Sequence, residues 1–192
     1  MAAYVAGNGT SRCSVNLVSV KKQGKLYGCN SIYKEITPDV LVATDEGQSH
    51  AIQLTGYALH HEFHTRKPYC DKGARQLKLP HANWSSGPNA VQLAVIDGHT
   101  EIFLFGFDFG GITDVFNNVF ASHEFYKKVG DDATYGGNWY NQIETIVRHG
   151  KKIKFTVVIG TQTDTSYTDS LKELENVEIM PLSEFLIHIN NV

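Results

Sequence analysis

The chain has 192 residues, of which 42% are hydrophobic and 19% are charged. This length and composition predict a single globular domain, residues 1–192, with a substantial core. The formal net charge of −3 offers no positive field to a phosphate backbone, which argues against a nucleic-acid partner. The longest apolar runs are far shorter than the roughly 20 residues of a membrane-spanning helix, so no membrane partner is expected.

The cysteine content indicates a reducing compartment. Cys13, Cys29 and Cys70 are odd in number and widely spaced, which does not suit a disulfide framework. The first residues also lack the basic segment and the following apolar run of a secretory leader. Together these features predict a cytoplasmic protein.

The first part of the chain predicts three short strands, each followed by small or polar residues. Ala3–Ala6 runs into a glycine turn at residues 7–11, and residues 26–29 run into Asn30. Val40–Ala43 is apolar on both faces, which is typical of a strand covered on both sides, and Asp45 lies just beyond it.

Helices and one further strand are expected around these segments. Ser11 or Ser14 is predicted to cap a short helix that ends at Val20. Residues 48–56 predict another short helix. Residues 57–66 alternate enough to predict a strand at the edge of the sheet, and such an edge could serve a homo-oligomer.

The second half continues the alternation of helices and strands. Ser86 is expected to cap a helix over residues 89–96, and Glu101–Phe105 predicts a central strand. Residues 111–138 are long, polar and aromatic, so they are a candidate lid loop, with Asn138 expected to cap the helix that follows. Later segments add strands and helices in the same order. The pattern predicts an α/β, Rossmann-like fold: a mostly parallel, twisted sheet with helices on both faces.

In such folds, ligands bind outside the carboxyl ends of the strands. Small or polar residues gather there in this sequence: Gly7, Asn8, Gly9, Ser11, Asn30, Asp45, Ser86, Gly87 and Asp108. The glycine turn could offer backbone N–H groups to a phosphate. It lacks the third glycine of the dinucleotide fingerprint and the Lys-Ser/Thr of a P-loop, so neither of those sites is supported. A turn required only by topology stays open as an alternative.

Three of these segments resemble, in order, motifs of the bacterial CMP-sialic-acid-dependent sialyltransferases. Residues 5–11, Val-Ala-Gly-Asn-Gly-Thr-Ser, are similar to their Gly-Asn-Gly-Pro-Ser motif, with Thr10 in place of the proline. Residues 27–33, Tyr-Gly-Cys-Asn-Ser-Ile-Tyr, are similar to their strand that ends in Cys-Asn before an aromatic residue. The Ser86-Gly87 pair and residues 101–109 look like their Ser-Gly helix and Gly-Ile-Asp-Phe segment.

The resemblance covers residues 1–111 and implies a nucleotide-dependent transferase. In this respect the chain resembles a glycosyltransferase that uses a cytidine or uridine nucleotide-sugar donor and requires no cofactor. It implies that Asn8 and Asn30 contact the nucleotide or its sugar. It implies that Ser11, Ser86 and Gly87 face phosphate or ribose, and that Asp108 positions them at the catalytic centre.

The lid is where the chain departs from this family. Gly110 and Gly111 stand where those enzymes have an aromatic residue. Their catalytic base is a lid histidine, and His123 is the one histidine in residues 111–138. A neutral imidazole could accept a proton from an acceptor hydroxyl, because its unperturbed pKa is about 6.5. An exposed loop histidine without a catalytic role is the alternative.

Two other functions stay open. The same outline recurs in motility-associated glycosyltransferases and in archaeal pterin pyrophosphokinases, and the latter would require Mg²⁺, which Asp45 and Asp108 could coordinate beside a diphosphate. The chain also looks like small uncharacterised proteins of tailed phages. A non-catalytic, virion-associated nucleotide-binding module is therefore a third hypothesis. A phage-encoded chain would lie in the host cytoplasm.

Two chemistries are not favoured by the residues. His60, His61 and His64 precede Cys70, but on a strand His61 would point away from the other two histidines, so no metal site is predicted. Cys29 is expected to be a buried strand residue rather than a nucleophile, because no histidine or lysine adjoins it.

Overall fold

The computed structural model describes residues 2–190. Its eight strands form one sheet in the order β5-β4-β3-β2-β1-β6-β7-β8, and every neighbouring pair is parallel. This confirms the predicted α/β, Rossmann-like fold. The strands are β1 (Ala3–Ala6), β2 (Lys25–Cys29), β3 (Val40–Ala43), β4 (Phe63–Thr65), β5 (Arg75–Gln76), β6 (Glu101–Phe105), β7 (Lys154–Ile159) and β8 (Val177–Pro181).

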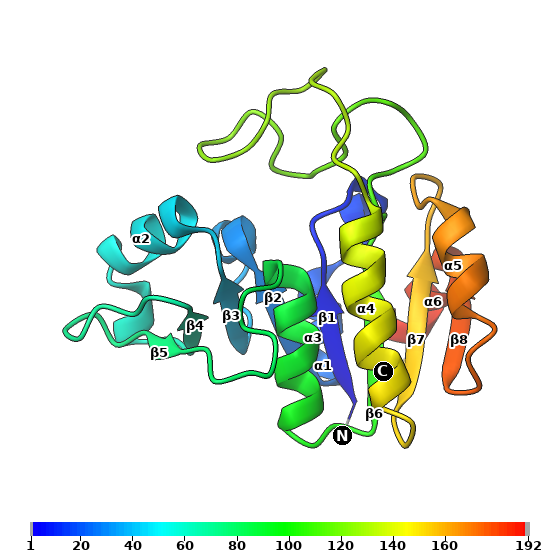
Figure 1. The fold of residues 1–192 in the computed structure, drawn as a ribbon, viewed down its shortest axis with the longest axis horizontal. Coiled ribbons are helices and arrows are strands. Elements are labelled where there is room, and N and C mark those ends of the chain that lie inside the picture. The colour runs from blue at the N-terminus through cyan, green and yellow to red at the C-terminus, as the bar shows by residue number, and fades with distance from the viewer. Residues whose placement is uncertain (1, 191–192) are drawn as a thin grey trace.

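Helices cover both faces of the sheet, as predicted. In Figure 1, α3, α4 and α5 lie in front of the strands, while α1 and α6 lie behind them. The α-helices are α1 (Leu17–Gln23), α2 (Glu46–Leu54), α3 (Ser86–Ile96), α4 (Gly137–His149), α5 (Thr165–Leu171) and α6 (Leu182–Asn190). Short 3-10 helices are η1 (Thr10–Ser14), η2 (Asn30–Lys34) and η3 (Tyr57–Leu59). No helix within residues 2–190 is long and apolar enough to cross a membrane.

The core forms two clusters, one on each face of the sheet. Along β1, Ala3 and Val5 pack in the cluster that contains side chains of α3, α4 and α5. Tyr4 and Ala6 pack in the cluster that contains side chains of α1, α2 and α6. Successive side chains of a strand point to opposite faces, so β1 supplies both clusters. The Tyr4 ring stacks on Phe103 of β6, with ring centroids 4.9 Å apart.

The chain after the glycine turn differs from the prediction. Instead of one helix capped by Ser11 or Ser14, a 3-10 helix is followed by α1, which begins at Leu17. Asn16 caps α1, because its Oδ1 accepts hydrogen bonds from the N–H groups of Val18 and Ser19. The predicted serine caps were therefore wrong, and an asparagine that does the same chemistry was overlooked.

The predicted edge strand over residues 57–66 is only partly correct. Gly56 takes a left-handed φ of 75° after α2, and η3 follows directly, so extended structure is confined to β4. The outermost strand on this side is the two-residue β5. The helix expected at residues 48–56 exists as α2, and it begins at Glu46 and ends at Leu54.

A long segment joins β6 to α4 and includes most of the predicted lid. Residues 106–136 contain no named helix or strand, apart from one antiparallel bridge between Val115 and Asp132. Figure 1 shows this segment as two open loops at the same end of the sheet as the tip of β1. Gly137 and Asn138 already belong to α4, so Asn138 is not its cap. We call residues 111–136 the lid segment.

Candidate functional site

A cleft of about 350 Å³ opens at the carboxyl ends of β1, β2, β3 and β6. Its position is set by topology: the strand order reverses at β1, which lies between β2 and β6. Ligands of open α/β sheets bind at this switch point. The volume lies at the lower end of the roughly 300–1,000 Å³ that small-molecule sites occupy.

The cleft brings together most of the residues that the sequence singled out. The predicted residues that line it are Gly7, Asn8, Gly9, Asn30, Asp45, Ser86, Gly87 and Asp108. Ser11 is buried beside Gly160 at the end of β7 and does not line the cleft. His123 is exposed in the lid segment and also lies outside the cleft lining, with its ring against Phe120.

The glycine turn is tightly built against β6. A Cβ at Gly7 would lie 2.3 Å from the carbonyl oxygen of Gly106, a distance no side chain can adopt. The N–H of Gly7 donates to Phe105 O at 2.8 Å, and that of Gly9 donates to Gly106 O at 2.9 Å. Glycine is therefore required here by the approach of two backbones at the switch point.

The amides of Thr10 and Ser11 bind protein side chains. The N–H of Thr10 donates to Asn117 Oδ1 at 2.8 Å, and that of Ser11 donates to Asp108 Oδ2 at 2.9 Å. The expectation that the turn's backbone amides hold a ligand phosphate is thus not met for Gly7, Gly9, Thr10 or Ser11. Sequence could not reveal this, because the acceptors lie about a hundred positions further along the chain.

Asp108 is the hub that joins three segments. Besides Ser11, its Oδ2 accepts from Asn117 Nδ2 at 3.1 Å, and its Oδ1 accepts from the hydroxyl of Thr163 at 3.0 Å. The carboxylate is buried, and a Cβ at Gly9 would lie 2.4 Å from it. These bonds occupy both oxygens, so the geometry makes Asp108 a positioning residue for the turn, the lid segment and the end of β7.

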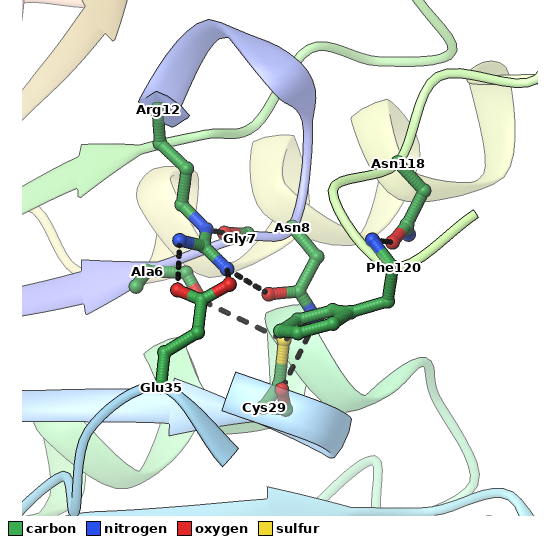
Figure 2. A network of polar contacts seen from close by, with 8 residues as sticks. All are labelled: Ala6, Gly7, Asn8, Arg12, Cys29, Glu35, Asn118 and Phe120. Carbon is green, nitrogen blue, oxygen red and sulfur yellow. Dashed lines mark hydrogen bonds and ion pairs between the residues drawn. The ribbon is translucent and has the colours of Figure 1, made fainter. Parts of the chain in front are cut away.

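A buried network that the sequence did not reveal lies beneath the turn (Figure 2). The Arg12 side chain is only 3% exposed, and its Nη1 pairs with Glu35 Oε2 at 2.8 Å. Its Nε donates to Gly7 O at 2.9 Å, and its Nη2 donates to Asn8 Oδ1 at 3.2 Å. Asn8 Nδ2 in turn donates to Cys29 O at 3.1 Å. The network ties the ends of β1 and β2 together, and the Asn8 amide works within it.

The lid segment is docked on this network. The N–H of Val119 donates to Asn8 O at 2.8 Å, and the buried Phe120 ring faces the guanidinium of Arg12 at 5.6 Å. The N–H of Phe120 is held by Asn118 Oδ1 at 2.9 Å. The first half of the lid segment is therefore anchored by hydrogen bonds and a cation–π contact.

Two polar groups in the cleft remain uncommitted. Asn30 has a left-handed φ of 54°, and its Oδ1 is buried without a hydrogen-bond partner among the described residues. Strained backbone and unpaired buried acceptors are both uncommon, and they concentrate at functional sites. Asp45 occupies the N-cap position of α2 but makes no capping bond, so its exposed carboxylate is free to meet a ligand.

The start of α3 forms the opposite wall. Ser86 lies inside the first turn of α3, not at its cap, which is Ser85. The Ser86 hydroxyl accepts from the N–H of Thr44 at 2.9 Å and pairs with the Thr44 hydroxyl at 3.0 Å. This side chain therefore joins α3 to the end of β3. Gly87 follows on the cleft side, where a Cβ would lie 3.2 Å from the Phe107 ring.

Aromatic rings and one cation complete the lining. Phe116, Phe125, Tyr126 and Trp139 line the cleft, together with Lys127. Burial raises the pKa of Tyr126 to about 12, so its phenol stays protonated at neutral pH. The sequence did not single out the lid residues Phe116, Phe125, Tyr126 and Lys127, because such residues in a loop carry no periodic signal.

Cys29 and the histidines near β4 have structural surroundings. Burial raises the pKa of the Cys29 thiol to about 12, which keeps it protonated and unreactive. Its predicted role as a buried strand residue is confirmed. No group of three or more metal-ligating side chains is present in this part of the chain, and His64 instead contacts Glu62 at 2.8 Å.

The fold and the cleft define a parallel α/β protein with a ligand-sized hollow at its switch point. Comparison with protein-family models, with curated proteins and with solved structures gave no match to this chain.

Proposed function

We propose that the cleft binds a nucleotide and that the protein is a nucleotide-dependent transferase of the glycosyltransferase type. The observation that carries this proposal is the pairing of Asn30 and Asp45 at neighbouring strand ends. Asn30 has a buried side-chain oxygen without a hydrogen-bond partner among the described residues, Asp45 has a carboxylate that makes no capping bond, and both residues line the same cleft. An amide oxygen suits a ribose hydroxyl or an exocyclic amino group of a base, and a carboxylate beside it suits the hydroxyl of an acceptor.

The aromatic lining supports the same proposal. Trp139, Phe125 and Tyr126 line the cleft together with the polar strand ends, and nucleobases stack on aromatic rings of this kind. The N-terminus of α3 at Gly87 supplies a positive dipole end for a phosphate. We place the phosphate there and not at the glycine turn, because the amides of Gly7, Gly9, Thr10 and Ser11 are already bonded within the protein.

A transferase also needs a base for the acceptor hydroxyl. Asp45 is the free carboxylate in the cleft, so we assign it that role. His123, the base implied by the sequence resemblance, would have to enter the cleft by movement of the lid segment. That segment is anchored on one side by Asn117, Val119 and Phe120.

The donor class follows the sequence resemblance, which implies a cytidine or uridine nucleotide sugar. The pyrophosphokinase alternative requires carboxylates for Mg²⁺, and the Asp108 oxygens are engaged by Ser11, Asn117 and Thr163. Asp45 alone is a poor magnesium site, which favours metal-independent binding. The non-catalytic module remains the candidate if nucleotides bind without turnover.

Thermal unfolding with CMP, CDP, UMP, UDP, AMP and ATP, each with and without Mg²⁺, tests the proposal. A ligand at 100 times its dissociation constant should raise the unfolding free energy by about 2.7 kcal/mol. A metal-independent increase with cytidine or uridine nucleotides is expected. An increase only with ATP and Mg²⁺, lost in Asp45→Asn, would instead favour the pyrophosphokinase. No increase with any nucleotide would overturn the proposal.

Hydrolysis of the sugar-nucleotide donor then separates enzyme from binding module. Turnover that falls in Asp45→Asn while nucleotide affinity persists supports the assigned base. Turnover that falls in His123→Ala instead would show that the lid segment delivers the base. Nucleotide binding without turnover would favour the non-catalytic nucleotide-binding module.

A further inference from the structure

A second hollow lies beside the cleft, between α2 and the residues that follow β4. It has a volume of about 300 Å³ and includes Thr44, Ser49, Gln53, Thr65, Arg66 and Lys67 in its lining. Asp45 separates the two hollows: it lines the cleft, whereas its neighbours Thr44 and Glu46 line this one. We call it the α2–β4 crevice.

The floor of the crevice is polar although it is buried. Ser49 and Gln53 lie one turn apart on α2 and face Thr65 at the end of β4, and all three are buried. A helix that packs on a strand usually does so with an apolar stripe. The hydroxyls of Ser49 and Thr65 lie 2.5 Å apart, and this bond consumes only one of their two protons. The hydroxyls of the floor are therefore bonded to each other, and Gln53 Nε2 donates to Ser49 Oγ at 3.3 Å.

Arg66 is a fixed cation at the rim. Its Nε and Nη2 both donate to the carbonyl oxygen of Thr44, at 2.8 and 2.5 Å. This clamp orients the guanidinium and leaves its other N–H groups unused. Within residues 2–190, no carboxylate lies within ion-pair distance of Arg66.

Lys67 supplies a second positive charge. Its Nζ lies 3.3 Å from Glu46 Oε1, but both side chains are about three-quarters exposed. Exposed pairs of this kind contribute little, so an incoming anion can compete for the ammonium group. The crevice thus combines one oriented guanidinium and one mobile ammonium group above a polar floor.

We propose that the α2–β4 crevice binds a phosphate group of a small molecule. A phosphate has enough oxygens to meet two N–H groups of Arg66 and the ammonium group of Lys67 at the same time, whereas a carboxylate has only two. The site is distinct from the nucleotide cleft and does not depend on the function proposed for that cleft. It would give this protein a second ligand whose phosphate lies on the far side of Asp45.

Amide and arginine Nε–H NMR spectra of the full chain, titrated with inorganic phosphate at constant ionic strength, test the site. We expect saturable shifts at Ser49, Thr65 and Arg66, with weaker saturation by acetate. Arg66→Met should weaken phosphate affinity by about tenfold or more, and Arg66→Lys by less, because lysine keeps the charge but loses the fork. Lys67→Met should weaken it several-fold.

Arg75→Met is the matched control, because Arg75 is an exposed arginine on the adjacent strand β5 that pairs with Glu62 outside the crevice. It should leave the phosphate isotherm unchanged. Shifts confined to the cleft, acetate binding as tight as phosphate, or unchanged affinity in Arg66→Met would overturn the proposal. If Arg66→Met does not fold, unchanged affinity in both Arg66→Lys and Lys67→Met overturns it.

The nucleotide screen separates this proposal from the cleft assignment. Nucleotide-induced shifts at Asn30 and Gly87 that persist in Lys67→Met, while phosphate binding weakens, show two independent sites. If no nucleotide binds, the cleft assignment fails, but phosphate should still bind to the wild-type protein and bind more weakly to Arg66→Met.

Discussion

The carboxylate of Asp108 accepts a hydrogen bond of 2.9 Å from the backbone N–H of Ser11, and it is buried where it does so. The contact fastens the end of β6 to the turn that follows β1. The same carboxylate also accepts hydrogen bonds from the side chains of Asn117 and Thr163. The shape of the cleft therefore depends on one acidic side chain whose two oxygens both accept hydrogen bonds from the protein.

Replacing Asp108 with Asn should destabilise the fold. An amide has one acceptor oxygen where the carboxylate has two, and hydrogen bonds to a charged group are worth more than neutral ones. We expect a loss of about 3 kcal/mol in urea unfolding. Asp131→Asn is the control, because the exposed Asp131 accepts one bond from Lys128 N–H, and its loss should be below about 1 kcal/mol. Equal losses in the two variants would contradict the positioning role.

Asn30 is expected to carry nucleotide affinity. Both Asn30→Ala and Asn30→Gly remove the unpartnered amide, so each should weaken nucleotide binding by about tenfold or more in calorimetric titration. The glycine variant should be the more stable of the two, because the φ of 54° strains alanine and not glycine. Asn141→Ala, at an exposed position of α4, should change neither property. Unchanged affinity in both Asn30 variants would remove this residue from the site.

The ion pair of the buried Arg12 with Glu35, which is about one-third exposed, should show strong coupling. Glu35→Ala leaves the guanidinium buried without its counter-charge, and such losses cost about 3–5 kcal/mol. A double-mutant cycle with Arg12→Met should give a coupling of about 2 kcal/mol or more. The exposed pair of Lys154 and Glu178 is the comparison, with an expected coupling below about 1 kcal/mol. Similar couplings for the two pairs would argue against a structural role for the network.

Stability should fall at alkaline pH. Burial raises the pKa of Cys29 from 9.0 to about 12 and that of Tyr126 from 10.0 to about 12. The folded state therefore holds these protons more tightly than the unfolded state, so their contribution is complete below about pH 9 and is lost as the pH rises towards 12. Urea unfolding between pH 8 and 11 should show this decline, and Cys29→Ala should reduce its slope between about pH 9 and 10. A flat profile would contradict the burial of these groups.

Much of the fold could be read from hydrophobic pattern. Val40–Ala43 and Glu101–Phe105 are strands with the bounds that their apolar runs predict. A run that is buried on both faces has no polar positions to blur its ends. The strand after Gly56 was harder to predict. Gly56 is left-handed and a 3-10 helix follows it, so only β4 of the expected strand is extended.

The sequence by itself determined which residues meet at the cleft. Parallel strands end at the same edge, so a polar residue just beyond a buried run, such as Asn30 or Asp45, is placed there by periodicity alone. Only the tertiary structure decided what each polar group does. Thr10 meets Asn117 across 107 positions, and Arg12 meets Glu35 across 23. Such pairings follow from how loops fold back over the sheet, and no local pattern encodes them. That is why the glycine turn proved to bind the protein's own side chains, while Asn30 and Asp45 were left free.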